Sequence, residues 1–330
     1  MNNNRLHLWI FLMLALATFL PSYSQTDPQN ENELKADSLN LVSEWEEGST
    51  LAIPPLFEYV VAPDNLPDLR SRTDYLMDKF WSPFDFKGTK SVDQNALTHA
   101  FNVYVQAMPF ASEKKVLDSV KKLISNIKNN PGLTLQFTKA AEEALYGKRA
   151  EFWSDQLYIP FLENLMANKK VPDSKKKKYK EQLELLKRNA LGAPLPQINF
   201  VSLDDSPSTL IFNKPFTILE FKTLDCEDCR YSDLKLDISS VVSDFLYENK
   251  LDVYTILIPE NDEAITLEKS ALNPKWHTGY SQNASTLLDL RMVPSFYLVD
   301  GSGKILAKNE VVDSVIEVLK SLSETNKSKK

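Results

Sequence analysis

Apolar residues recur with a helical period along the first half of the chain. Between about Leu69 and Ala190 they fall three and four positions apart, which places them on one face of a helix. The clearest runs are Ala96, Leu97, Ala100, Phe101 and Tyr104, and then Val116, Leu117, Val120, Leu123, Ile124 and Ile127. Further helices are predicted at 70–81, 133–146, 156–168 and 174–190. Residues 51–190 are therefore expected to form one all-α domain.

The period changes after the segment Gly192–Pro196, which marks a domain boundary. Apolar runs of strand length follow at 216–221, 252–258 and 295–299, and the last continues through a turn into 304–307 as a hairpin. Helices are predicted at 234–247, 282–290 and 311–322, and residues 260–281 are expected to be irregular. This order predicts a small mixed sheet with helices on both faces over 191–325, followed by a tail at 326–330. The expected fold class is thus a two-domain α+β chain with an all-α domain before an α/β domain.

The N-terminus has the pattern of a secretory signal. Arg5 precedes an apolar run from Leu8 to Leu20, Pro21 breaks the run, and small residues follow up to Ser24. The run is too short to span a bilayer of roughly 30 Å comfortably. We predict a cleavable signal peptide at 1–24 and a flexible polar lead-in at 25–50, with an uncleaved anchor as the alternative. No membrane contact is expected after cleavage.

Charge and glycine content exclude two classes of partner. The chain carries 45 acidic and 38 basic residues, a net charge of −7, whereas binding to nucleic acid needs a basic face. It has only 8 glycines and contains neither GxGxxG nor GxxxxGK[ST]. We therefore expect no nucleic acid and no cofactor.

Candidate chemistry lies in the chain's two cysteines, Cys226 and Cys229. They follow a predicted buried strand and open a helix, whose N-terminal N–H groups and dipole stabilise a thiolate. A disulfide across so short a loop constrains little, which favours a working dithiol over a structural staple. Zinc sites also use this spacing, but zinc needs four ligands, usually with a second pair of Cys or His residues. The chain has 3 histidines, and one of them, His7, would leave with the signal peptide. We expect no metal site.

Two segments resemble the thioredoxin-like family, especially its exported TlpA/ResA-type branch. They are Phe216–Arg230, which reads FTILEFKTLDCEDCR, and Arg291–Asp300, which reads RMVPSFYLVD. The opening PLPQINFVSL at 194–203 resembles the first strand of that branch. The resemblance covers about 190–325 and implies a thioredoxin-like fold there. It gives no role to the helical domain.

The resemblance also implies site residues and an activity, thiol–disulfide oxidoreduction. Cys226 would be the attacking thiol and Cys229 the resolving thiol. Pro294 would be a cis-proline against the disulfide, and Val293 would offer its backbone to the substrate chain. Glu220, six residues before Cys226, would be a buried acid that moves protons for the resolving thiol; a surface carboxylate on an edge strand is the alternative.

The interior of the motif departs from the family pattern. The family usually has Trp before the first cysteine and Pro at the end of the interior dipeptide, whereas this chain has Asp225 and Glu227-Asp228. Three carboxylates should raise the pKa of the Cys226 thiol and stabilise the disulfide, which favours a reductant. We expect a periplasmic enzyme that reduces exported proteins with disulfides and takes electrons from a membrane thiol–disulfide carrier. The alternative is a non-catalytic binding module whose helical domain engages a partner.

Overall fold

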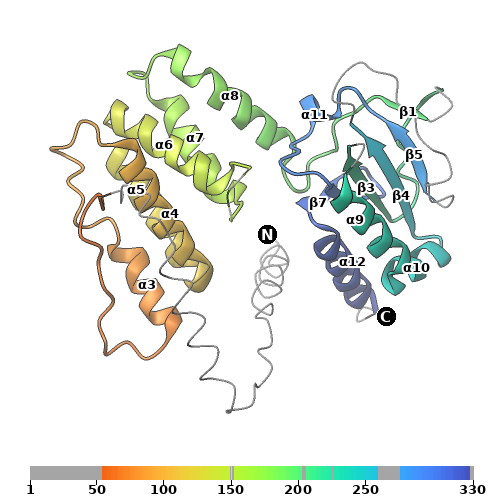
Figure 1. Cartoon of the computed structure of the whole chain (residues 1–330), viewed down its shortest axis with the longest axis horizontal. Coiled ribbons are helices and arrows are strands. Elements are labelled where there is room, and N and C mark those ends of the chain that lie inside the picture. Colours follow the sequence, from red (N-terminus) through yellow and green to blue (C-terminus); the bar gives the residue numbers. More distant parts are fainter. Residues whose placement is uncertain are drawn as a thin grey trace, which may run out of the picture. The chain divides into compact units, whose positions relative to one another are not determined.

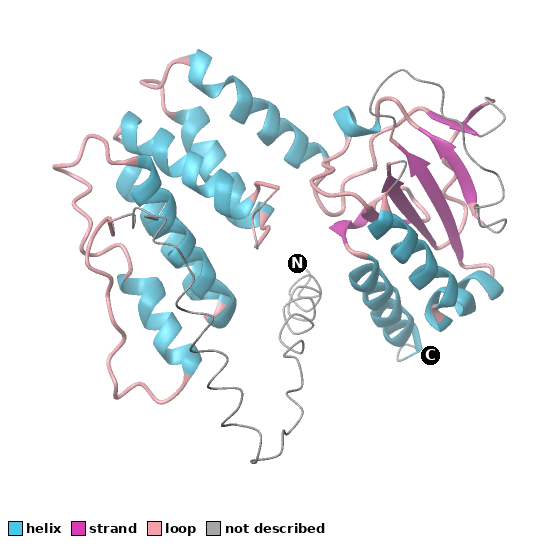
Figure 2. Ribbon diagram, in the orientation of Figure 1, coloured by secondary structure: helices cyan, strands magenta, loops and turns pink. Residues whose placement is uncertain are grey.

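The computed structural model describes residues 54–148, 150, 152–202, 206–223, 226–258 and 276–327. The predicted signal peptide at 1–24 and lead-in at 25–50 lie outside these residues. Helices make up the first part of the described chain, and a mixed sheet with its own helices follows (Figures 1 and 2). The prediction of an all-α region before an α/β region is confirmed.

Helices of the first region agree with the predicted ranges to within a few residues. Their bounds are α3 (Leu69–Lys79), α4 (Gln94–Ala107), the short 3-10 helix η4 (Met108–Phe110), α5 (Glu113–Ile127), α6 (Pro131–Leu145), α7 (Asp155–Ala167) and α8 (Asp173–Arg188). Local signals set several of these ends. Asn130 caps α6 by accepting a hydrogen bond from the Leu133 N–H at 3.1 Å, and Pro131 occupies the first turn, where no N–H is needed.

Contacts divide the described residues into two compact units. The first holds 54–84 and 92–116, and the second holds 85–91 and everything from 117 onward. The second unit therefore contains α6, α7 and α8 together with the sheet. This division does not coincide with the boundary predicted after residue 190, so the predicted domain limits stay predictions.

The first unit is built around aromatic rings. Phe101 and Tyr104, on the apolar face of α4, are fully buried. The Tyr104 ring lies 5.2 Å from that of Phe80 and 5.6 Å from that of Trp81, measured between centroids. Asp93 begins α4 by accepting a hydrogen bond from the Ala96 N–H at 2.9 Å. Large rings bury much apolar area and so contribute strongly to the stability of a small helical core.

The sheet has seven strands among the described residues, in the order β2-β1-β5-β4-β3-β6-β7. Their bounds are β1 (Phe200–Ser202), β2 (Pro207–Ser208), β3 (Phe216–Lys222), β4 (Leu251–Leu257), β5 (His277–Tyr280), β6 (Ser295–Asp300) and β7 (Ile305–Glu310). β3 runs parallel to β4 and antiparallel to β6, so it lies inside the sheet with a neighbour on each side. The sheet is therefore mixed, as predicted, and the predicted C-terminal hairpin is also confirmed.

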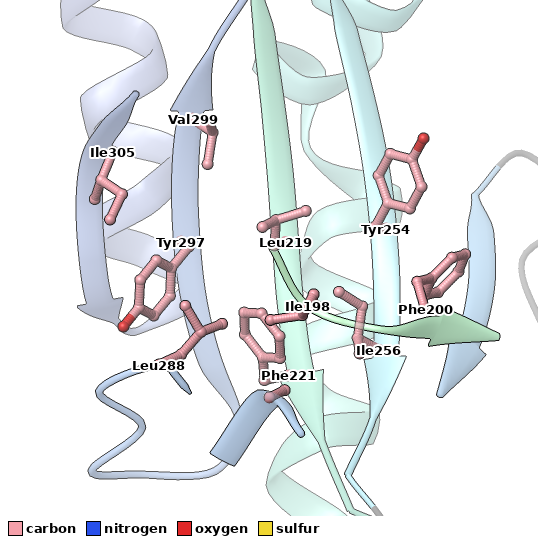
Figure 3. Close-up of a cluster of buried hydrophobic side chains, with 11 residues drawn as sticks. Ile198, Phe200, Leu219, Phe221, Tyr254, Ile256, Leu288, Tyr297, Val299 and Ile305 are labelled. Atoms are coloured by element: carbon pink, nitrogen blue, oxygen red, sulfur yellow. The ribbon is translucent and has the colours of Figure 1, made fainter. Parts of the chain in front are cut away.

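Three helices cover one face of the sheet, and among the described residues the other face carries a single short helix. α9 (Glu227–Ile238), α10 (Ser240–Tyr247) and α12 (Val312–Lys327) pack together on one face (Figure 1). The other face carries an apolar cluster to which α11 (Ala284–Leu287) contributes (Figure 3). Its labelled members include Leu219 and Phe221 of β3, Tyr254 and Ile256 of β4, and Tyr297 and Val299 of β6. Strand residues alternate between the two faces, so Ile218 and Glu220 point toward α9.

Two local predictions need correction. Residues 277–280 form β5, inside the segment expected to be irregular, and a Cβ on Gly279 would lie only 2.6 Å from the Phe200 ring. Glycine therefore permits the close approach of β5 to β1. No local sequence pattern predicts this contact. The single helix predicted at 234–247 is two helices, because Ser239 leaves the helical conformation and caps α10 by accepting from the Val242 N–H.

Candidate active site at the dithiol

Cys226 and Cys229 lie where β3 gives way to α9. They form a disulfide with an S–S distance of 2.03 Å. Cys226 is the N-cap of α9, and its Sγ accepts a hydrogen bond from the Cys229 N–H at 3.1 Å. The first sulfur thus lies at the positive end of the helix dipole, beside N–H groups that favour a thiolate.

The two cysteines differ in exposure. Cys226 is half-buried, whereas Cys229 is 2% exposed. A partner thiol or disulfide therefore reaches the first sulfur more readily than the second. This matches the predicted order of attacking and resolving thiols, although the roles themselves stay predictions. Glu227 and Asp228 are exposed in the first turn of α9, and Asp225 lies outside the described residues.

Glu220 is completely buried on the α9 side of the sheet. Thr255 of β4 donates a hydrogen bond from Oγ1 to Glu220 Oε2 at 3.1 Å, and Glu220 Oε1 is buried with no hydrogen-bond partner among the described residues. Burial raises the pKa of Glu220 to about 8. The prediction that this acid is buried is confirmed, and its surface alternative is wrong.

Lys222 and Asp233 form an ion pair beside Glu220. Lys222 Nζ donates to both carboxylate oxygens of Asp233, at 3.0 and 2.8 Å, and lies 3.8 Å from Glu220 Oε2. Lys222 acts to lower the pKa of Glu220, and Asp233 acts to raise it. Asp233 is partly exposed, so the group extends from the buried acid to the surface of α9.

A second carboxyl group with a raised pKa lies in the same row of the sheet. Phe296 of β6 pairs with Glu220 on one side and with Glu310 of β7 on the other. Burial raises the pKa of Glu310 to about 7. Sequence reasoning assigned no role to Glu310, because a carboxylate at the end of an edge strand ordinarily points into water.

The cis-proline loop lies at the same end of the sheet as the dithiol. The Val293–Pro294 peptide bond is cis, and the following residue, Ser295, pairs with Phe221 near the end of β3. The chain leaves β3 toward Cys226, so the loop and the dithiol extend from neighbouring strand ends. Val293 is 38% exposed and is accessible to a partner.

The amino-terminal half of the chain identifies a family. Residues 22–189, just over half of the chain, match the family described as "Domain of unknown function (DUF5106)". The chain belongs to the DUF5106 family. No curated protein matches the sequence.

Solved structures extend the likeness beyond the DUF5106 region. A thioredoxin-like protein from Bacteroides caccae ATCC 43185 is similar over 80% of this chain and 98% of its own, with a TM-score of 0.65 and 20% identity. The thioredoxin domain of a thiol-disulfide oxidoreductase from Bacteroides vulgatus covers 40% of this chain and 97% of its own, with a TM-score of 0.33 and 21% identity. The first likeness shows the fold, which is thioredoxin-like after the DUF5106 region.

Sequence reasoning missed a charged cluster next to the cis-proline loop. Arg291, three residues before Pro294, is 8% exposed and pairs with Asp289 and with Asp155 of the DUF5106 region. Lys308 of β7 pairs with the same two carboxylates. No spacing signal could have found the whole cluster, because Asp155 stands 136 positions before Arg291. The available local signal is that Arg291 begins the RMVPSFYLVD segment, which carries the family resemblance.

His277 takes an ordinary position in the sheet. His277 begins β5, where its exposed ring stacks on Tyr254 at 4.6 Å between centroids. Across the described ranges, His, Cys, Asp and Glu side chains form no group of three or more that could hold a metal ion. Within the same ranges, no helix has the length and apolar character needed to cross a membrane.

Proposed function

We propose that this DUF5106 protein is a thiol–disulfide oxidoreductase that reduces disulfides of exported proteins through Cys226 and Cys229. The observation that carries the proposal is the dithiol at the start of α9. An accessible sulfur caps the helix, and a buried sulfur stands one turn behind it. The segments around Cys226 and Pro294 that resemble the thioredoxin-like family support the same activity.

The reaction consists of two thiol–disulfide exchanges. The Cys226 thiolate attacks one sulfur of a client disulfide, a mixed disulfide forms, and the other client sulfur leaves as a thiolate that takes up a proton. The Cys229 thiolate then attacks Cys226 Sγ and releases the second client sulfur, which is protonated in turn. Two electrons pass to the client, and the Cys226–Cys229 disulfide closes.

Glu220 is the proposed proton acceptor for the Cys229 thiol. The Cys229 side chain is buried, so water has poor access to its proton. A carboxyl group with a pKa of about 8 can both hold and release a proton near neutral pH. Asp233, paired to Lys222 at the edge of this group, offers a route for that proton toward solvent.

The proposed direction of electron transfer rests on the charge around Cys226, and the proposed location of the protein rests on its N-terminal sequence. Glu227 and Asp228, with Asp225 before them, place negative charge around Cys226, which disfavours its thiolate and stabilises the disulfide. The apolar run at Leu8–Leu20 supports export to the periplasm. A membrane thiol–disulfide carrier is the proposed electron donor, because the periplasm is kept oxidising.

Trapping of mixed disulfides tests the activity. In Cys229→Ser the resolving step is absent, so client proteins should remain covalently attached to Cys226 and run as higher-mass species that reductant dissolves. The matched control, Cys226→Ser, keeps one cysteine but should capture almost nothing, because Cys229 is buried. Equal capture by both variants, or by neither, contradicts the assignment.

Alkylation separates an enzyme from a binding module. After mild reduction, Cys226 should be labelled readily between pH 7 and 8 while Cys229 is protected. A disulfide that resists such reduction supports the binding module instead. The reduction potential tests the direction of electron flow: a value near about −120 mV, typical of a strong periplasmic oxidant, contradicts the role of a reductant.

A further inference from the structure

The second compact unit contains a buried four-charge cluster contributed by two regions of the chain. Arg291 binds Asp289 in a bidentate manner, from Nε to Oδ1 at 3.1 Å and from Nη2 to Oδ2 at 2.7 Å, and the same Nη2 also contacts Asp155 Oδ1. Lys308 Nζ lies 2.6 Å from Asp155 Oδ2 and 2.8 Å from Asp289 Oδ2. Each cation thus contacts both carboxylates. Asp155 is the member that comes from the DUF5106 region.

Two aromatic rings of the DUF5106 region complete the binding site for Arg291. The guanidinium carbon lies 4.4 Å from the centroid of the Tyr146 ring and 5.7 Å from that of Trp153. Planar guanidinium groups stack favourably on such rings. The Trp153 indole N–H donates to the Gly147 carbonyl oxygen at 2.8 Å, which fixes the ring. The backbone position of Asp155 is also fixed, because Asp155 is the first residue of α7 and follows the N-cap Ser154.

The charges balance, and this balance is needed because the cluster is buried. Asp289 is 1% exposed, and Arg291 and Lys308 have side-chain exposures of 6% and 8%. Burial alone would raise the pKa of Asp289, but Lys308 and Arg291 outweigh burial and lower it. Removing one partner from such a group leaves a buried charge uncompensated. Asp155 therefore matters to the state of Arg291 even though it lies far away in the sequence.

Arg291 is also the first residue of the cis-proline loop, and the loop is tied down at both ends. Asn309 Oδ1 accepts hydrogen bonds from the Arg291 N–H at 3.2 Å and from Ser295 Oγ at 3.3 Å. Only Met292, Val293 and Pro294 lie between these two points. The backbone of Arg291 is thus fixed by β7, and its side chain is held between Asp289 and the Asp155, Tyr146 and Trp153 side chains of the DUF5106 region.

We infer that the DUF5106 region positions the cis-proline loop, with Asp155, Tyr146 and Trp153 acting as positioning residues through the Arg291 side chain. Under the proposed function, on which the catalytic part of this inference rests, the loop presents Val293 to the client chain. The helical region then contributes to client binding without contacting either cysteine.

Hydrogen exchange of the full-length protein tests the structural part. In Asp155→Asn, the backbone amides of Arg291, Met292, Val293 and Ser295 should exchange about tenfold faster than in the unmodified protein. The matched control is Glu142→Gln, which breaks an ion pair of a similarly buried carboxylate with Lys178 inside the helical region. That variant should leave the loop amides unchanged. Unchanged loop exchange in Asp155→Asn, or equal acceleration in both variants, overturns the inference.

Kinetics test the catalytic part. In reduction of a protein disulfide, Asp155→Asn should raise KM about fivefold with a much smaller change in kcat, and the Cys226–Cys229 reduction potential should not move. Glu142→Gln should change none of these. An unchanged KM overturns the catalytic part. If loop exchange accelerates but the unmodified protein reduces no disulfide, the positioning of the loop stands and the proposed function fails.

Discussion

In the helical region the buried side chains are apolar, aromatic or neutral polar with one exception among the described residues, Lys176, whose ammonium donates to a backbone carbonyl at 3.3 Å. Among its described residues, the thioredoxin-like region buries Glu220, Asp252, Asp289 and Arg291, and the Lys308 side chain is 8% exposed. Burial of a charged group is costly unless it is paired, so such groups cluster where chemistry or recognition needs them. The contrast supports placing the proposed chemistry in the second region.

Within the thioredoxin-like region, the buried charges are not equally compensated. Asp252 pairs with Lys214 at 2.7 Å, and Asp289 pairs closely with Arg291. Glu220 accepts a hydrogen bond from the neutral Thr255 hydroxyl, and its nearest described cation, Lys222, lies 3.8 Å away and pairs more closely with Asp233. Weak compensation leaves the pKa of Glu220 at about 8, so this group exchanges a proton near neutral pH, whereas strong compensation lowers the pKa of Asp289 and keeps it charged. Their roles differ accordingly, one being suited to proton transfer and the other to holding Arg291 in place.

Truncation of an aromatic side chain in the helical core should have the largest effect on stability. Phe101 is fully buried, with its ring 5.9 Å from that of Tyr104. Phe101→Ala should lower the free energy of unfolding by about 3–5 kcal/mol, measured by urea denaturation. Phe110 is 54% exposed, so Phe110→Ala should cost less than about 0.5 kcal/mol. Similar losses in the two variants would contradict an apolar core around α4.

Removal of the buried acid should change how stability depends on pH. The pKa of Glu220 is about 8 in the folded protein and about 4.5 when exposed, so between these values the folded state holds a proton that the unfolded state lacks. Stability therefore falls as pH rises from about 4.5 to 8, by about 1.4 kcal/mol for each unit of pKa difference. In Glu220→Gln this fall should be smaller, as urea denaturation of the oxidised protein at several pH values would show. Glu310 contributes with the same sign, so some slope should remain.

Substitution of Lys222 should shift the titration of Glu220 itself. Lys222 lowers the pKa of Glu220, so Lys222→Met should raise that pKa by about one unit. Carboxyl carbon NMR of the oxidised protein measures the midpoint directly. Lys250, which pairs with Glu248 at the surface, provides the control, and Lys250→Met should leave the midpoint in place. A midpoint that does not respond to Lys222→Met would show that this cation does not tune the acid.

An exposed ion pair of the helical region should have the smallest effect. Lys180 lies 3.9 Å from Glu184 on α8, and both side chains are more than 60% exposed. Pairs of this kind contribute at most about 0.5 kcal/mol, because water screens them. Lys180→Ala should therefore leave the urea midpoint nearly unchanged. A loss comparable to that of Phe101→Ala would mean that surface charges stabilise the helical region as much as its core does.

Patterns of short range predicted most of the secondary structure. The helical period of 96–104 and 116–127 corresponds to α4 and α5, and the buried run at 216–221 corresponds to β3. Such patterns work because burial of one face of a helix or strand is decided within a few residues. The break at Ser239 and the strand at 277–280 were missed. The first depends on a single cap, and the second depends on how closely Gly279 approaches a distant strand.

By itself the sequence determined the order of the two regions, the dithiol at a strand-to-helix junction and the burial of Glu220, because each depends on neighbours in the chain. Only the tertiary structure decided what surrounds these groups. Asp233 reaches Lys222, beside Glu220, because α9 packs on this face of the sheet, and Asp155 meets Arg291 although the two stand 136 positions apart in the chain. Charges so far apart in the chain interact strongly only after folding has brought them into contact and excluded water from between them.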